Sequence, residues 1–459
     1  MHFLKTPSLF ALLALVWVGQ TIASEKPVKP PEFEWAISAA GPGHDKPRGL
    51  AVDPDGNVLL TGEFTGTAAF GEFKRTAVGS MDFFVAKVSP AGKFLWVATG
   101  GGELIDRGYA VASDHLGHAY VTGHFQSPTA AFEKVTITNG GNYDLFVAKY
   151  GPDGQLLWIK TGGGAGYDYG HGIAADRQGN VFVSGAVAGE GAYDGQALGH
   201  LGPSHLVCLG LDADGKLRWH HAAAGKGSSS GHAITADQRG NCYLGGFAAG
   251  ASTLAGKPLG AGGGRDLVVA KFDAAGRLVW LHTGHGSDSA MVHEIAADSQ
   301  GNVWASGMFT GELTLADRSV ANAGKHDILL TRFDTQGKRL WTRTAGGAGI
   351  DYGLGITTDG RGNCYTTGSF TGEVAFEGTQ QKSQTAGSDI HILKLDADGR
   401  LQWFQQAGGI RTDHAYSIVS DGHANLYLSG ACRGPASFGK HTLDNLGSND
   451  IFLAKIGIQ

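Results

Sequence analysis

DLFVAKYGPDGQLLWIKTGGGAGYDYGHGIAADRQGNVFVSGAVA, residues 144–188, sets the pattern of this chain, because its features return from one end of the sequence to the other. Its tryptophan belongs to a set of seven spaced 61 or 62 residues apart: Trp35, Trp96, Trp158, Trp219, Trp280, Trp341 and Trp403. A fixed period of this kind indicates one supersecondary unit that is copied and stacked, because a single copy cannot bury its own apolar faces. The period predicts an architecture and leaves the ligand or reaction open.

Each unit contains the signals of four short antiparallel strands. An aspartate 18 residues after each tryptophan opens a tight turn, as in DRQGN at 176–180, where Gly and Asn supply the positive φ of a hairpin. A second strand such as VFVSG at 181–185 follows, and a longer connection leads to a third, apolar strand such as DLFVAK at 144–149. Another Asp/Gly turn leads into the fourth strand, which contains the tryptophan. The second and third strands are apolar on both faces, as expected for small sheets sandwiched between neighbours.

The two ends of the repeat complement each other. Residues 451–459 form a third strand that no tryptophan strand follows, whereas the missing strand stands at the start as FEWAIS, residues 33–38. We therefore predict an all-β fold, a seven-bladed β-propeller with four-stranded antiparallel blades, closed by the N-terminal strand completing the last blade. Closure of this kind removes exposed sheet edges. The single propeller domain is expected to cover residues 33–459, which leaves no room for a separate catalytic domain.

The repeating residues resemble a known family. Asp144 to Ala188 and Asp327 to Phe370 are similar to the SBBP repeat of exported bacterial seven-bladed β-propellers, and the resemblance covers roughly residues 33–459. The resemblance implies a propeller scaffold and export from a bacterial cell. It implies no common reaction, so no catalytic residue is transferred from the family.

The N-terminal segment has the pattern of a secretory signal peptide, expected to cover residues 1–24. A short positive start precedes an apolar run from Leu9 to Val18 and a small-residue exit near Ala23. Residues 25–32, which contain KPVKPP, read as an extended linker. We expect a secreted or periplasmic protein with no membrane span. The net charge of −6, with scattered Lys and Arg, argues against nucleic acid as a partner.

Several recurring residue types invite a chemical interpretation. The four cysteines are expected to be buried small apolar side chains: Cys208, Cys242, Cys364 and Cys432.

Aspartates that begin the third strand, and others ten residues after the tryptophan, share one face of the predicted ring. They could form a cation site, since hard cations take oxygen ligands, but the favoured interpretation is that each accepts loop N–H groups and fixes a turn. No metal ligand and no cofactor is predicted.

The repeat breaks between blades three and five, where histidines accumulate. His205 replaces a third-strand aspartate, Ser229 and Ala290 replace loop aspartates, and further histidines stand at 220, 221, 282 and 285. Three successive blades have histidine 13 residues after the tryptophan, and a glutamate follows the last: His171, His232, His293 and Glu294. Imidazoles are common metal ligands and acid–base groups, so these residues and His205 are the candidate ligand-binding residues. Against a site, the apolar residue two positions later suggests that the three histidines face the neighbouring blade.

The leading functional hypothesis is a monomeric recognition scaffold. It would bind a protein or a glycan through the face with the long connections between second and third strands, because these connections vary most between blades. The alternative is an enzyme or a cofactor or metal binder, either a lyase or a quinone-type oxidoreductase, with a site near blades three to five. No nucleophile-elbow, zinc-protease or phosphate-loop motif is present, and no catalytic residue is assigned.

Overall fold

A computed structural model describes residues 28–200, 202, 204–260, 264–315, 318–384 and 386–458. The predicted signal peptide and residues 25–27 of the predicted linker lie outside these ranges. Within them the chain forms β-strands and no α-helix, so the all-β class is confirmed. No helix with the length and apolarity to cross a membrane occurs in the residues that were described.

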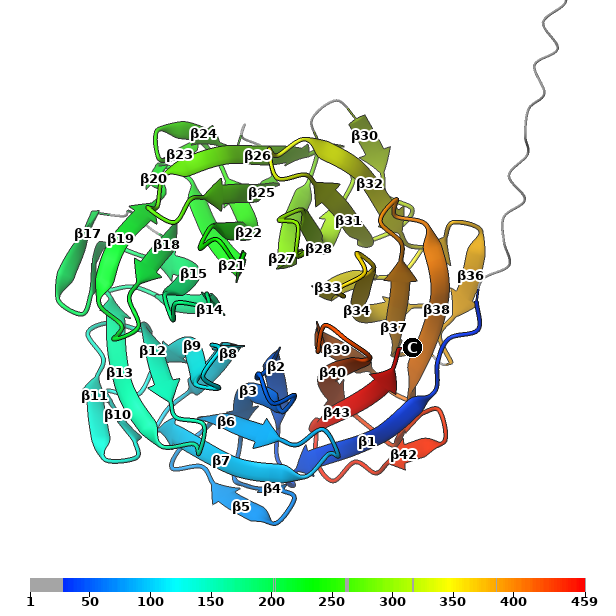
Figure 1. The fold of residues 1–459 in the computed structure, drawn as a ribbon, viewed down its shortest axis with the longest axis horizontal. Coiled ribbons are helices and arrows are strands. Elements are labelled where there is room, and N and C mark those ends of the chain that lie inside the picture. The colour runs from blue at the N-terminus through cyan, green and yellow to red at the C-terminus, as the bar shows by residue number, and fades with distance from the viewer. Residues whose placement is uncertain are drawn as a thin grey trace, which may run out of the picture.

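The strands pair antiparallel in groups of four, each of which we call a blade. In Figure 1 the described blades surround a central opening, with the first strand of each blade innermost and the tryptophan strand outermost. In chain order, blade 1 consists of β2 (Lys46–Val52), β3 (Val58–Phe64), β6 (Asp82–Val88) and β7 (Phe94–Gly101), and blade 2 consists of β8 (Asp106–Ser113), β9 (Ala119–Phe125), β12 (Asp144–Tyr150) and β13 (Leu156–Gly163). Blade 3 consists of β14 (Tyr169–Ala175), β15 (Val181–Val187), β18 (His205–Leu211) and β19 (Leu217–Ala222), blade 4 of β21 (Ser228–Ala236), β22 (Cys242–Ala249), β25 (Arg265–Phe272) and β26 (Leu278–Gly286), and blade 5 of β27 (Ser289–Ala297), β28 (Val303–Thr310), β31 (Asp327–Phe333) and β32 (Arg339–Ala345). Blade 6 consists of β33 (Tyr352–Thr358), β34 (Cys364–Thr371), β37 (Ser388–Leu395) and β38 (Leu401–Gly409), and blade 7 of β39 (Asp413–Ser420), β40 (Asn425–Cys432), β43 (Asp450–Gly457) and β1 (Phe33–Ala40).

The last blade joins the two ends of the described chain. β1 pairs antiparallel with β43 over a register that runs from Phe33 opposite Ile456 to Ala39 opposite Ile451. Figure 1 shows the blue first strand lying alongside the red last strand. The N-terminal tryptophan strand therefore lies as the fourth strand beside β43.

The apolar core lies between blades. Every residue of β3, β6, β9 and β12 is buried, which confirms that second and third strands are apolar on both faces. One buried cluster joins Phe84 of blade 1 to Leu453 of blade 7, so each sheet stabilises its neighbour. The four cysteines are buried and free, as predicted.

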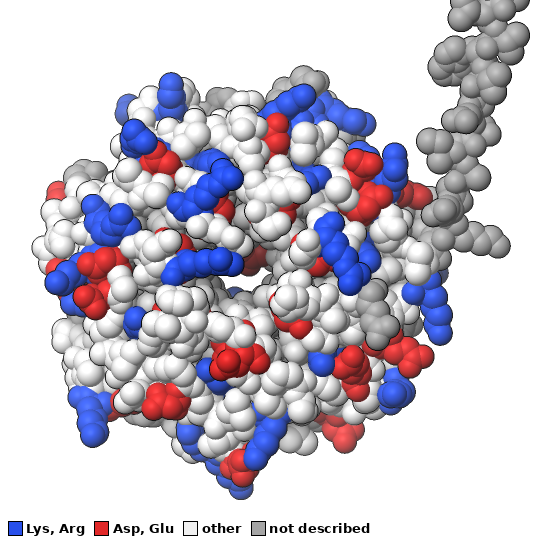
Figure 2. All heavy atoms as spheres, viewed as in Figure 1, with Lys and Arg blue, Asp and Glu red and all other residues white. Residues whose placement is uncertain are grey.

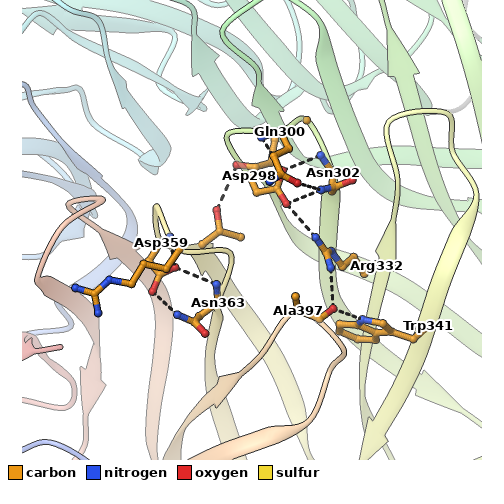
Figure 3. Close-up of polar contacts among 12 residues, drawn as sticks. Asp298, Gln300, Asn302, Arg332, Trp341, Asp359, Asn363 and Ala397 are labelled. Carbon is orange, nitrogen blue, oxygen red and sulfur yellow. Dashed lines mark hydrogen bonds and ion pairs between the residues drawn. The ribbon is translucent and has the colours of Figure 1, made fainter. Parts of the chain in front are cut away.

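The periodic tryptophans join each outer strand to the next blade. The indole Nε1 of Trp341 donates to the carbonyl oxygen of Ala397, 3.0 Å away, in the turn between β37 and β38, and Arg332 Nη1 donates to the same oxygen at 2.7 Å (Figure 3). Trp35, Trp96, Trp158 and Trp280 make the equivalent bond to the following blade. A Cβ on Gly399 in that turn would lie 2.8 Å from the Trp341 ring, so only glycine permits this packing. The period of 61 or 62 residues is therefore the interval at which this inter-blade contact recurs along the chain.

The long connections contain strands that were not predicted. Each forms a short outer hairpin: β4–β5 (Thr67–Phe70, Phe73–Thr76), β10–β11 (Thr129–Phe132, Val135–Thr138), β16–β17 (Glu190–Tyr193, Gln196–His200), β23–β24 (Ser252–Leu254, Lys257–Leu259), β29–β30 (Glu312–Leu315, Arg318–Ala321), β35–β36 (Glu373–Phe376, Thr379–Lys382) and β41–β42 (Ala436–Phe438, His441–Leu443). The first hairpin strand pairs with the preceding blade, as β16 does with β13, and β23 pairs with β20 (Ala224–Gly225). These connections are therefore inter-blade contacts rather than free loops.

Candidate functional site

A β-bulge in the first strand of every blade shapes the wall of the central opening. In blade 3 the pairing moves from Gly170–Gly185 to Gly172–Ser184, so that His171 has no opposite residue. The same shift occurs at the equivalent position of the other blades. We call the seven bulged residues the belt: Arg48, Tyr109, His171, His232, His293, Leu354 and Tyr416.

All seven belt residues line a central cavity of about 890 Å³. The belt lies toward the end of each first strand where the chain enters from the preceding blade, which we call the loop face. The opposite side, with the tight hairpin turns, is the turn face. Figure 2 views the molecule from one side, where positive and negative side chains are interspersed around a narrow central opening. The cavity has the size of a site for a small organic ligand.

The structure brings the three predicted belt histidines together. The ring centroids of His171 and His232 are 4.9 Å apart, and those of His232 and His293 are 6.0 Å apart. Tyr109 continues this arc, 4.9 Å from His171. As the apolar residue two positions later suggested, these histidines contact the neighbouring blade, and they line the cavity as well. Each of them stands at the bulge of its strand, where the regular alternation of side chains is interrupted.

Burial keeps the imidazoles of this arc uncharged at neutral pH. It lowers the pKa of His232 to about 4 and that of His293 to about 3, and it places the pKa of His171 well below 6.5. Burial also raises the pKa of Glu294, which lines the same cavity, to about 7. This part of the wall therefore offers neutral hydrogen-bonding rings and one carboxyl group that ionises near neutral pH.

On the side of blade 1, Arg48 lines the cavity, and two cations that do not line it, Lys46 and Arg107, lie nearby. We call these three residues the cationic arc. Arg48 binds the fully buried Glu63 through three contacts of 2.7–3.1 Å, and Arg107 Nε lies 3.9 Å from the same carboxylate. Lys46 Nζ lies 4.2 Å from the centroid of the Tyr416 ring. Within the described ranges it has no hydrogen-bond or ion-pair partner. Burial, with Arg48 next, lowers the pKa of Lys46 to about 8. A single carboxylate thus faces several cations. The belt has the Arg48 guanidinium on one side, backed by the other two cations, and the neutral imidazoles on the other.

The other predicted histidines lie elsewhere. His205 is buried at the start of β18 and does not line the cavity. His221 and His282 lie on outer strands, where their rings stack on Phe272 and Phe333. Across the described residues, no group of three or more His, Cys, Asp or Glu side chains is arranged to hold a metal ion.

The recurring aspartates accept main-chain N–H groups of the turns and loops around them. On the turn face Asp298 Oδ1 accepts the N–H groups of Gln300 and Asn302 at 3.0 and 2.9 Å (Figure 3). On the loop face Asp168 accepts the N–H groups of Gly164 and Ala188 at 2.6 and 2.7 Å.

The sequence analysis missed the cationic arc. Its detectable signal was Glu63, a charged residue within the otherwise apolar strand VLLTGEF, which in this position requires a buried cation as partner. Arg48 stands at the position where the other blades have Tyr, His or Leu. Its pairing with Glu63 depends on two adjacent strands and is not visible in a single segment.

Comparison with known proteins supports the repeat. Residues 157–185 match the family model described as SBBP, beta-propeller repeat. An uncharacterized WD repeat-containing protein, L264, of Acanthamoeba polyphaga mimivirus is 24% identical over 153 residues, which are 30% of this chain and 11% of that protein. The regulatory protein FlaEY of Caulobacter vibrioides is 25% identical over 136 residues, which are 28% of this chain and 14% of that protein. The matches thus span only a small part of either relative.

Among solved structures, a protein of unknown function from Dyadobacter fermentans aligns with 94% of this chain and 100% of its own. The sequence identity is 10% and the TM-score is 0.42.

Proposed function

We propose that this protein is an exported recognition scaffold that binds an acidic glycan at the loop-face mouth of its central cavity. The scaffold would be a closed seven-bladed propeller, residues 33–459, that reaches the periplasm or the cell exterior through the signal peptide at 1–24. The β1–β43 pairing and the repeat support the closed ring. The apolar run at Leu9 to Val18 supports export.

The observation that favours an acidic glycan is the division of the belt. The cationic arc around Lys46 and Arg48 suits a carboxylate or sulfate group, since hydrogen bonds to ionised groups are the stronger ones. The neutral imidazoles of His171, His232 and His293 can each donate and accept, as sugar hydroxyls require. Tyr109 and Tyr416 lie between the two arcs and offer flat apolar surfaces. Of the earlier hypothesis of a protein or glycan partner, this geometry favours the glycan.

The outer hairpins are weaker candidates for the binding surface. Their first strands pair with the preceding blade, and buried side chains such as Phe132 and Tyr193 anchor them. Their length is therefore explained by inter-blade packing.

Isothermal titration with uronate-containing oligosaccharides tests the proposal, with neutral oligosaccharides of equal length for comparison. Lys46→Gln is the informative variant, because it removes a charge without leaving a buried partner unpaired. We expect about tenfold weaker binding of the acidic sugar, the loss of one hydrogen bond to a charged group, and a reduced salt dependence.

Lys74→Gln, an exposed lysine on the outer hairpin of blade 1, is the matched control and should leave the affinity unchanged. Equal affinity of the unmodified protein for acidic and neutral sugars would contradict the role of the cationic arc. So would an equal effect of the two substitutions.

A second candidate function, a lyase, is favoured by Glu294. A carboxyl group with its pKa raised to about 7, next to the neutral His293 in a cavity, is typical of an acid–base pair. Incubation with the same uronate oligosaccharides distinguishes the two functions. Unsaturated product that disappears in Glu294→Gln would indicate a lyase, whereas binding without turnover would indicate recognition.

A further inference from the structure

Buried aspartates form pairs across the blade boundaries of the loop face. The first residue of a third strand lies beside the loop aspartate of the next blade, as Asp82 of blade 1 does beside Asp106 of blade 2. The two carboxylates approach one another over Gly101. A Cβ placed on this glycine would lie 2.6 Å from Asp82 Oδ1 and 3.0 Å from Asp106 Oδ2. We call the place between two blades where such a pair lies a groove. Three further grooves have the same arrangement: Asp144 and Asp168 over Gly163, Asp327 and Asp351 over Gly346, and Asp389 and Asp413 over Gly408.

Each of these four pairs leaves a buried carboxylate oxygen without a hydrogen bond. The atoms concerned are Oδ1 of Asp82, Asp144, Asp327 and Asp389. Each of these residues is at most 7% exposed. The remaining oxygens accept loop N–H groups, as Asp82 Oδ2 does from Val78 at 2.9 Å. Two adjacent buried carboxylates are not both stable as anions without a compensating charge, and a buried acceptor without a partner is costly.

The other three grooves provide an internal comparison. Between blades 7 and 1, Ala40 stands at the glycine position, and the oxygens of Asp45 and Asp450 all accept main-chain N–H groups. Between blades 3 and 4 both aspartates are lost together, to His205 and Ser229, and Ala224 stands at the glycine position.

Between blades 4 and 5 the loop aspartate is replaced by Ala290. Here His285 occupies the glycine position, and its Nδ1 lies 3.1 Å from Asp266 Oδ2. Among the described grooves, glycine thus occurs only where both aspartates are present and a carboxylate oxygen has no hydrogen-bond partner. In each of the other grooves a residue with a side chain takes the place of the glycine. Glycine is absent where either aspartate is missing, and it is also absent between blades 7 and 1, where both aspartates are present and fully hydrogen-bonded.

We propose that each of the four glycine-containing grooves binds one hard divalent cation, Ca²⁺ fitting best, between its two aspartates. One divalent ion neutralises two carboxylates and gives the unpartnered oxygens a partner. Oxygen donors select a hard cation, and Ca²⁺ accepts the irregular geometry that two carboxylates, main-chain oxygens and water provide. With only two charged ligands, the expected dissociation constants are about 10⁻⁴–10⁻³ M, as in extracellular modules.

Such an ion would join neighbouring blades, because its two ligands come from different sheets. The tryptophan contacts join the blades near the turn face, and the cations would join them on the loop face. Ca²⁺ would then stabilise the folded ring by mass action, since the unfolded chain does not hold the two carboxylates together.

The first experiment uses the unmodified protein after dialysis against a chelator. Ca²⁺ added at millimolar concentration should raise the melting temperature by several degrees, whereas NaCl of equal ionic strength should not. Equilibrium dialysis with metal analysis should give up to four Ca²⁺ per chain, and Tb³⁺ luminescence should be displaced by Ca²⁺. Absence of both retained cation and stabilisation would overturn the proposal. So would stabilisation on acidification from pH 7.5 to pH 5.5 without a Ca²⁺ effect, since a shared proton would then compensate the pairs.

Two variants locate the sites. Gly101→Ala fills one groove as Ala40 does in the groove between blades 7 and 1, and Asp82→Asn removes one ligand of the same groove. Each should lower the Ca²⁺ content by about one per chain. Asp450→Asn makes the same chemical change in the groove that Ala40 fills, and it should leave the Ca²⁺ content unchanged. An equal loss in Asp82→Asn and Asp450→Asn would contradict the assignment, and the count remains readable if a variant is merely less stable.

Discussion

At the scale of single residues, the positions that recur in every blade are mainly inter-blade contacts. The tryptophan meets the Asp/Gly turn of the next blade, 55 or 56 residues downstream, because the indole both donates to the turn and packs on its glycine. Trp219 departs from this pattern, since its Nε1 is buried without a partner and His221 Nε2 instead lies against the carbonyl oxygen of Gly276. Recurrence alone is therefore a poor guide to ligand-binding residues in such a repeat.

His391 offers a residue-scale test of burial. It lies in β37, both its ring nitrogens are buried without a hydrogen-bond partner, and burial lowers its pKa to about 3. The equivalent third-strand residues of blades 1 and 2 are Phe84 and Phe146. We expect His391→Phe to fold and to be less sensitive to acid than the unmodified protein.

The direction of this pH effect follows from the difference between the pKa of His391 in the folded and in the unfolded protein. The folded state disfavours protonation of His391, so its contribution to stability is complete above the unfolded pKa of 6.5 and is lost as the pH falls. At pH 5 the unmodified protein should lose about 2 kcal/mol that the variant keeps. Urea unfolding at pH 7 and pH 5 measures the difference, with exposed His115→Gln as the control. Equal pH dependence of His391→Phe and the unmodified protein would show that the ring is not buried as described.

At the scale of elements, the bulges and outer hairpins determine what the blades expose. His171, His232 and His293 stand at these bulges, where they line one cavity and also contact the neighbouring blades. The first strand of each outer hairpin pairs with the preceding blade and so connects the two blades. A local signal for them existed in turns such as Asp194–Gly195, where both residues have positive φ, as a two-residue hairpin requires.

Tyr193 tests the hairpin role. It is fully buried although it lies in a connection between strands, and its hydroxyl donates to the carbonyl oxygen of Gly215 at 3.3 Å. Tyr193→Ala should cost about 3 kcal/mol or more, as for a core aromatic side chain. Tyr167→Ala, 52% exposed, should cost less than about 0.5 kcal/mol. Denaturant midpoints compare the two, and similar small effects would mean that the hairpin is a free loop.

At the scale of the whole molecule, the fold was predictable because periodicity is a global property of the sequence. The period, the two-faced burial of second and third strands, and the complementary ends each pointed to the same ring. The site was predictable only in part. The three histidines stood out as breaks in the repeat, whereas the Arg48–Glu63 pair and the aspartate pairs depend on contacts between strands or blades that no single segment shows.

Removal of residues 28–40 tests the ring as a whole. The deletion leaves the edge of β43 unpaired and removes Phe33, which is buried in the blade 7 core. We expect a markedly lower melting temperature, because an open propeller loses two inter-blade interfaces at once. A synthetic peptide of residues 28–40 should restore the melting temperature, and a scrambled peptide should not. Unchanged stability of the truncated protein would contradict closure through β1.

The pairing of β1 with β43 also has a consequence for biosynthesis. The segment 33–40 is synthesised before every other described strand, yet its hydrogen-bonding partner, β43, is synthesised after all of them. During translation the apolar strand β1 therefore lacks its partner β43 until all the intervening sheets have been synthesised. We therefore expect the nascent chain to depend on a holding chaperone, and its final maturation to be a single late step in which the first segment finds the last.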